Sequence, residues 1–205
     1  MPSFLKTSLA IGLLALSLNA HAAKTTINFD DYGIPDAVRM IDNGYAGLDW
    51  FNFGVVKGTG VDFAGTGYEW GTVSGDYAAF NSRGEDAGFS SGANKNFTLY
   101  NLLLTAAWRD STVEFYGYDN GQLKNTLSVN TSATTPVLVH FNWSNIDAVR
   151  LHVVSKNFGG QQVVENIKFE FTAPLPVPEP ETYAMLLAGL GLIGFARRRK
   201  ASLRA

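Results

Sequence analysis

Four side chains with oxygen donors lie at the ends of two segments that have the pattern of β-strands. Asp30 and Asp31 end the first predicted strand, and Glu165 and Asn166 lie near the start of the last one. Glu165 lies two residues before Ile167 and so falls on the same predicted face of the strand as Ile167 and the apolar residues that follow at every second position. A period of two therefore predicts that its side chain points inward. A carboxylate at such a position either lies at a solvated rim or binds a ligand. These four residues are therefore candidates for a binding site.

Large aromatic residues are concentrated in two glycine-containing segments, 45–54 and 67–77. Trp and Tyr rings stack on the apolar C–H faces of sugars, and neighbouring polar side chains bind the hydroxyl groups. Trp50 and Trp70 are the candidates for such stacking. The alternative is that they fill the core, which is the position that we expect for Trp143.

The patterns that could support catalysis lack their required context. Residues 88–92 match G-x-S-x-G, but no hydrophobic strand precedes them and no helix pattern follows. His140 and His152 do not have the spacing of zinc ligands, and the chain has no cysteine for thiolate chemistry. No pair of carboxylates stands out for glycoside hydrolysis, although such pairs can lie far apart in a chain. We therefore expect a protein that is not an enzyme, with a polysaccharide hydrolase or lyase as the alternative.

Apolar residues at every second position predict strands in the second half of the chain. Further strands are expected at 25–30 and 96–107, and Asn120-Gly121 favours a type I′ hairpin turn. The residues expected to face the core are Val113, Phe115, Val137, Val139, Phe141, Trp143, Val149, Leu151, Val153, Ile167, Phe169 and Phe171.

Strands at intervals of roughly 10–15 residues, without helix patterns between them, predict an all-β fold. We expect a single antiparallel β-sandwich or jelly roll over residues 24–172, with the first and last strands close together. The glycine-rich segment 54–92 is expected to form long loops.

The predicted sandwich loosely resembles carbohydrate-binding jelly rolls, through its fold and the acidic residues at two strand ends. Such jelly rolls often hold their terminal strands together with calcium. The resemblance implies a Ca²⁺ site formed by Asp30, Asp31, Glu165 and Asn166. Solvated rim carboxylates are the alternative.

The first 23 residues have the three parts of a secretory signal peptide. Lys6 lies in a short positive region, residues 9–18 form an apolar stretch, and residues 20–22 are an A-x-A cleavage pattern. The apolar stretch is too short for a stable membrane span. We therefore expect an exported protein whose mature chain begins near Lys24.

The C-terminus combines a proline-rich linker, 173–181, with a short apolar segment and a basic tail, 182–205. Proline keeps the linker extended, because it lacks an N–H group and restricts the preceding residue. The uncharged residues 182–196 would extend about 22 Å as a helix, short of the roughly 30 Å of a hydrocarbon core. Arg197, Arg198 and Arg199 would stop this transmembrane helix and stay cytoplasmic.

The order of these C-terminal parts resembles the PEP-CTERM protein-sorting signal of Gram-negative bacteria. Val177, Pro178, Glu179 and Pro180 match the motif, and the apolar segment and the arginines follow it. The resemblance implies recognition by an exosortase, transient residence in the inner membrane, and delivery to the cell surface or extracellular matrix of an exopolysaccharide-producing species. A tail anchor that is never cut is the alternative.

The part of the chain between the two targeting segments is acidic. Residues 24–180 carry ten Lys and Arg and seventeen Asp and Glu, a net charge of −7. This charge disfavours nucleic acid as a partner and is compatible with calcium. We expect a non-enzymatic surface protein that is associated with exopolysaccharide or biofilm and has extracellular polysaccharide as a partner. A purely structural adhesin or matrix component is a further alternative.

Overall fold

The computed structural model describes residues 23–33, 38–92, 95–154, 159–172 and 188–190. The contacts divide the chain into two units, Met1–Thr172 and Ala173–Ala205. Residues 1–22 of the predicted signal peptide, the linker 173–181 and the basic tail lie outside the described residues, as does most of the predicted sorting helix. Among the residues that are described, no helix is long and apolar enough to cross a membrane.

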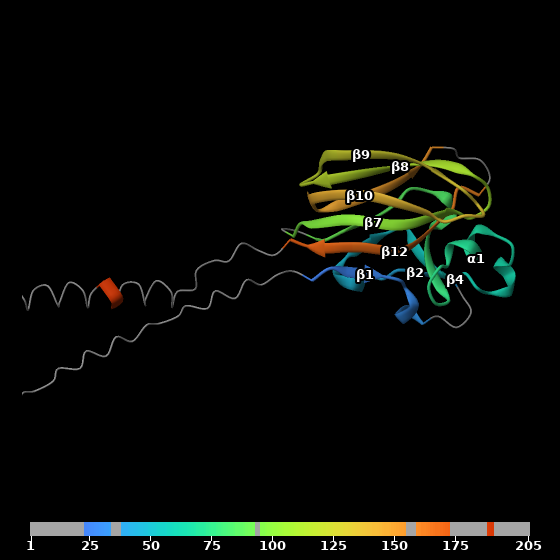
Figure 1. Ribbon diagram of the computed structural model, residues 1–205, viewed down its shortest axis with the longest axis horizontal. Coiled ribbons are helices and arrows are strands. Elements are labelled where there is room, and N and C mark those ends of the chain that lie inside the picture. The colour runs from blue at the N-terminus through green and yellow to red at the C-terminus, as the bar shows by residue number, and fades with distance from the viewer. Residues whose placement is uncertain (1–22, 34–37, 93–94, 155–158, 173–187, 191–205) are drawn as a thin grey trace, which may run out of the picture. The chain divides into compact units, whose positions relative to one another are not determined.

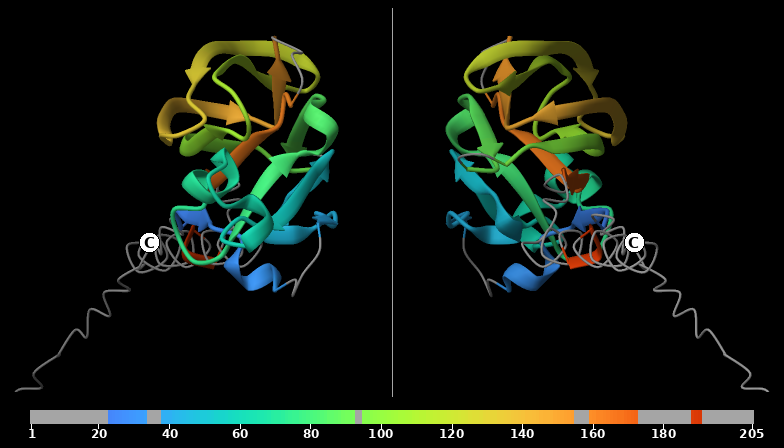
Figure 2. Two further views of the ribbon diagram at one scale, coloured as in Figure 1. Left: turned by 90° about the vertical axis from the view of Figure 1, so that its right-hand side faces the viewer. Right: turned by 90° about the vertical axis from the view of Figure 1, so that its left-hand side faces the viewer.

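The described part of the first unit is built on two antiparallel sheets, so the predicted all-β sandwich is confirmed (Figures 1 and 2). One sheet has the order β10-β7-β12-β5-β4-β2, with β1 paired to β12, and the other has the order β3-β6-β11-β8-β9. The strands of the seven-stranded sheet are β1 (Thr25–Ile27), β2 (Arg39–Met40), β4 (Phe53–Lys57), β5 (Tyr77–Asn81), β7 (Phe97–Ala106), β10 (Val137–Ile146) and β12 (Gln162–Phe171). Those of the five-stranded sheet are β3 (Asp49–Phe51), β6 (Ala87–Ser90), β8 (Ser111–Asp119), β9 (Gln122–Thr131) and β11 (Ala148–Val153).

Short helical turns connect these strands. The α-helix α1 (Gly67–Gly71) packs against β7 and β12 on the outside of the larger sheet. The 3-10 helices are η1 (Asp30–Tyr32), η2 (Tyr45–Gly47), η3 (Val61–Phe63) and η4 (Ser82–Gly84).

The alternating apolar residues meet between the two sheets in one hydrophobic core. Ten of the twelve residues predicted to face inward are buried there, and Val137 and Phe171 pack against them while partly exposed. Burial of apolar area contributes about 25 cal/mol per Å² and is the main stabilising term. The face of each of these strands is therefore predicted correctly.

The hairpin between β8 and β9 has the predicted turn. Asn120 and Gly121 have φ angles of 51° and 74°, the left-handed values that a type I′ turn requires. The terminal strands are also neighbours as expected, because Thr25 pairs with Phe169 and Ile27 with Ile167 (Figure 1).

The prediction that segment 54–92 forms long loops is wrong, because it contains most of β4 and all of β5, α1 and β6. β4 has no alternating pattern because both of its faces are covered: Val55 lies in the main core and Val56 lies in a second cluster beside Tyr68 of α1. Glycine allows α1 to approach β7 closely, since a Cβ atom at Gly67 would lie 1.8 Å from the Ala106 carbonyl oxygen.

Candidate functional site

Glu165 is fully buried, but on the opposite face from the one predicted. Asn166 has a left-handed φ of 51°, and the pairing with β7 shifts between Glu165 and Lys168, so a β-bulge interrupts the alternation. Glu165 therefore shares the α1-covered face with Val163 and does not face the core with Ile167. Sequence patterns assume an unbroken period of two and could not locate this bulge.

The loop 74–76 covers the Glu165 carboxyl group and also contacts Asp30. The Ser74 hydroxyl donates to Glu165 Oε1 at 2.7 Å, while Glu165 Oε2 is buried without a hydrogen-bond partner. The Asp76 backbone N–H donates to Asp30 Oδ1 at 3.0 Å. Gly75 has a φ of +54°, and a Cβ atom there would lie 1.9 Å from Asp30 Oδ1. Only a residue without a side chain lets this loop lie against the Asp30 carboxylate.

The carboxyl groups of Asp30 and Glu165 thus contact the same loop, and the Glu165 group is shielded from solvent. Burial raises the pKa of Glu165 from its ordinary value of 4.5 to about 7, the Ser74 hydrogen bond lowers it, and the charge of Asp30 raises it further. An ionised carboxylate that is buried with an unpartnered oxygen is unfavourable. Binding of a proton or of a cation removes this cost.

The other two predicted ligands have different surroundings. The Tyr45 hydroxyl donates to Asp31 Oδ1 at 2.6 Å, so this carboxylate is engaged with Tyr45. Asn166 forms the bulge next to Glu165. Within the described ranges, no three His, Asp or Glu side chains are grouped closely enough to hold a metal ion. The structure therefore brings Asp30 and Glu165 to the same loop, 74–76. These three residues lie in the segment that is predicted to form long loops, and no sequence pattern marks them as part of a site.

The two candidate stacking residues differ in exposure. Trp50 is only 7% exposed, its Nε1 donates to the Tyr45 carbonyl, and its ring packs against Phe53 and Phe89. The prediction that Trp50 could stack on a glycan is wrong, since the alternating position between Asp49 and Phe51 turns it into the core. Trp70, on α1, is 47% exposed. Trp143 is buried as expected.

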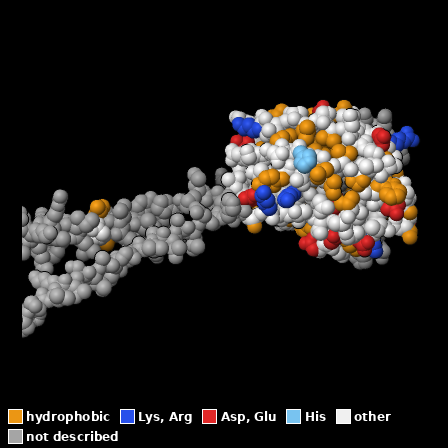
Figure 3. All heavy atoms as spheres, in the orientation of Figure 1, with side chains coloured by type: hydrophobic (Ala, Val, Ile, Leu, Met, Phe, Trp, Pro, Cys, Tyr) orange, Lys and Arg blue, Asp and Glu red, His pale blue; other side chains and the backbone are white. Residues whose placement is uncertain are grey.

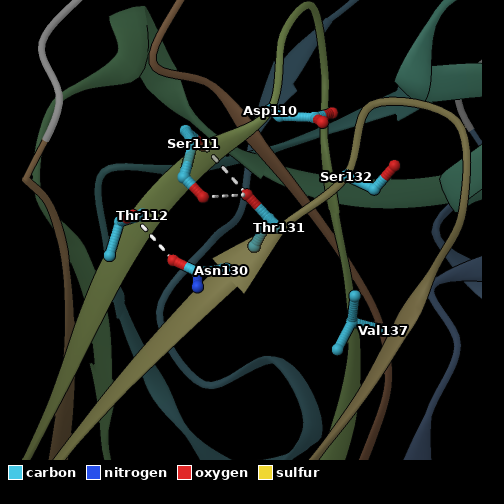
Figure 4. A pocket seen from close by; sticks show the side chains of 7 residues that line it. All are labelled: Asp110, Ser111, Thr112, Asn130, Thr131, Ser132 and Val137. Atoms are coloured by element: carbon cyan, nitrogen blue, oxygen red, sulfur yellow. Dashed lines mark hydrogen bonds between the residues drawn. The ribbon is translucent and has the colours of Figure 1, made fainter.

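A polar pocket of about 430 Å³ opens where β8 begins and β9 ends (Figure 4). The Ser111 and Thr131 hydroxyls lie 2.9 Å apart, and Thr112 Oγ1 donates to Asn130 Oδ1 at 2.9 Å. Gln162 lies buried behind the pocket, and its Nε2 donates to Ser111 Oγ. The lining is thus mainly hydroxyl, amide and carboxylate groups, consisting of Asp110, Ser111, Thr112, Asn130, Thr131, Ser132 and Val137.

The first three residues of the G-x-S-x-G sequence, 88–90, lie in strand β6. Its serine, Ser90, is the last residue of β6 and pairs with Asp49 and Ala148. A nucleophile elbow instead needs a sharp turn from a strand into a helix. His152 Nδ1 lies 2.7 Å from Asp86 Oδ1 on the outside of the five-stranded sheet.

Solved structures that are similar to this chain have low identity and low TM-scores. The K1 cleaved adhesin domain of Lys-gingipain from Porphyromonas gingivalis W83 is 12% identical with a TM-score of 0.44, over 74% of this chain and 99% of that one. TmCBM61 in complex with β-1,4-galactotriose is 12% identical with a TM-score of 0.36, over 72% and 94% of the two chains. A Streptococcus pneumoniae fucose binding module is 13% identical with a TM-score of 0.35, over 69% and 95%.

No curated protein matches the chain. A family model described as the PEP-CTERM protein-sorting motif does match, at residues 176–200. The match includes Val177, Pro178, Glu179 and Pro180, and it confirms the resemblance inferred from the sequence. Such a motif indicates an exported protein that is sorted through the membrane, and it implies processing by an exosortase. The chain therefore carries, after its β-sandwich, a PEP-CTERM sorting motif that marks it as a protein for export.

Proposed function

We propose that the protein is a non-enzymatic component of the cell surface or exopolysaccharide matrix of a Gram-negative bacterium, and that its β-sandwich binds glycans there. The observation that carries the proposal is the PEP-CTERM match at residues 176–200, directly after a separate β-sandwich unit. In this proposal the signal peptide directs export, the C-terminal segment holds the chain transiently in the inner membrane, and an exosortase releases the sandwich.

The surface of the sandwich supports a role in binding polyhydroxylated ligands. The pocket in Figure 4 is lined mainly by groups that can exchange hydrogen bonds with hydroxyls. On the face seen in Figure 3, acidic side chains lie mostly around the margin, and hydrophobic and uncharged atoms surround a histidine side chain near the centre. A surface of this kind suits an uncharged ligand better than a highly charged one.

We also propose that calcium stabilises the domain through Asp30 and Glu165. The donor atoms fit a hard cation, since they are carboxylate oxygens and one of them, Glu165 Oε2, is buried without a partner. Calcium accepts backbone carbonyl oxygens and water as well as carboxylates, so loop 74–76 and solvent would complete its coordination. The ion would balance the two charges and hold the terminal strands and the loop together.

Replacement of Glu179 by Ala is expected to block C-terminal processing in the native host. The reason is that Glu179 lies between the two prolines of the matched sorting motif, which an exosortase is proposed to recognise. Intact-mass measurement should find the wild-type surface pool without residues 197–205, and the variant retained in the inner membrane with them.

Glu181→Ala is a matched control, because it removes a neighbouring carboxylate outside the Pro-Glu-Pro sequence. It should be processed like the wild type. A wild-type surface pool that still carries residues 197–205 would show that the C-terminus is a permanent anchor.

Binding and turnover on the same glycans would test the role of the sandwich. The purified mature protein should retain polysaccharide without releasing reducing or unsaturated ends. Release of such ends would instead establish the hydrolase or lyase alternative, and a protein that binds no glycan would fit a structural matrix component.

A further inference from the structure

We propose that the outer face of the five-stranded sheet is a binding site for neutral polysaccharide, with the sugar chain lying across β3, β6, β11 and β8. This inference rests on the proposed glycan-binding function and assigns it to particular residues. We call the site the cross-strand trough and define it by Phe51, Ser90, Tyr118, Ala148 and Arg150.

Two depressions on this face form the trough. One, of about 140 Å³, lies on the β3 side and includes Phe51 and Ser90. The other, of about 360 Å³, lies on the β8 side and includes Tyr118. Both are lined by Ala148 and Arg150, so they are adjacent and together cross four strands. Three strand spacings of about 4.8 Å give a length of roughly 14 Å, enough for a short oligosaccharide.

The strand register explains the depth of the trough. Ser90 pairs with Asp49 on one side and with Ala148 on the other, and Ala148 also pairs with Tyr118. Small side chains therefore occupy the middle of this cross-strand row, with larger ones at its two ends. Because the core-facing neighbours Phe89 and Val149 are buried, Ser90 and Ala148 face outward and form the floor.

The next cross-strand row supplies the wall. Gly88 pairs with both Phe51 and Arg150, and its lack of a side chain lets the Arg150 side chain extend toward Phe51. The guanidinium carbon lies 5.5 Å from the centre of the Phe51 ring, within the range of a cation–π contact. Tyr116 pairs with Arg150, and its hydroxyl donates to Glu114. These contacts hold the wall in one arrangement before a ligand binds, which lowers the entropy cost of binding.

The chemistry of the trough suits a sugar ring. Phe51 is 55% exposed and Tyr118 is partly exposed, so apolar ring surface is available for C–H stacking at both ends. Arg150 offers several N–H donors between them, and Asp49 and Asp147 offer acceptors for hydroxyl groups.

The charges of the trough select the class of glycan. Its lining has two carboxylates, Asp49 and Asp147, against one cation, Arg150. The sandwich as a whole is acidic as well. A polyuronate would be repelled by this field, whereas a neutral hexopyranose chain would not.

Affinity electrophoresis of the processed protein would test the site. The probes are neutral polysaccharides, namely a β-1,4-glucan, a β-1,4-galactan and a mannan, with polygalacturonate as the acidic probe. We expect at least one neutral polysaccharide to be bound, and Tyr118→Ala and Arg150→Ala each to weaken that binding about tenfold. Trp108→Ala is the matched control, because it removes an exposed aromatic ring outside the trough and should leave the affinity unchanged. Trp70→Ala tests the other stacking candidate.

The possible failures can be distinguished. Binding that is lost in Trp70→Ala and retained in both trough variants would overturn the site but keep the glycan-binding function. Preference for polygalacturonate would overturn the assignment to neutral glycans. If no probe is bound by a wild-type protein whose circular dichroism shows folded β-structure, the proposed glycan-binding function itself fails.

Discussion

In EDTA, ionisation of Glu165 is expected to lower the free energy of unfolding by about 3 kcal/mol as the pH rises from 4.5 to 7. The pKa of this carboxyl group is raised from 4.5 to about 7 in the folded chain, so the folded state binds the proton more tightly than the unfolded state. Its stabilising contribution is therefore complete below pH 4.5 and is lost as the pH rises through about 7. Chemical denaturation at several pH values would measure this loss.

Glu165→Gln is the matched control for this pH dependence. The neutral amide can still accept the hydrogen bond from Ser74 but cannot ionise, so the loss of stability in this pH range should largely disappear. If wild type and variant have the same pH profile, the buried carboxyl group is not the source.

The sequence predicts most of the sandwich because its strands obey local rules. Inward residues such as Val149 and Leu151 follow an unbroken period of two, and Asn120-Gly121 specifies its own turn. β4 was missed because a strand covered on both faces loses that period.

The candidate sites depend on contacts between distant parts of the chain, which no local pattern encodes. Ser74 and Glu165 form a hydrogen bond although they lie 91 residues apart in the sequence. The bulge at Asn166 determines which face Glu165 lies on, and its only sequence signal is an Asn, which tolerates a left-handed φ. The trough exists because Gly88, Ser90 and Ala148 fall in register on neighbouring strands. Register could be known only from the folded sheet. The sorting motif, by contrast, is a linear signal and could be read directly from the sequence.

Calcium is expected to raise the melting temperature of the domain at pH 7.5 by about 6–10 °C. At a free concentration of one hundred times Kd, an ion that binds only the folded state contributes about 2.7 kcal/mol, and this energy gives a shift of that size for a domain of about 150 residues. Magnesium should give a smaller shift, because it gives up its water shell reluctantly and demands a strict octahedral geometry. Differential scanning calorimetry in EDTA, calcium and magnesium would measure the three melting temperatures.

Substitutions in the two acidic neighbours separate a calcium site from general charge screening. Asp30→Asn keeps an acceptor for the Asp76 N–H but removes a charge beside Glu165, so it should reduce the calcium shift strongly. Asp31→Asn removes the same charge one residue away, where the carboxylate accepts from Tyr45, and should leave most of the shift intact. Equal shifts in the wild type and both variants would mean that calcium acts on the acidic surface as a whole. The buried Glu165 carboxyl group would then be neutralised by a proton and not by calcium.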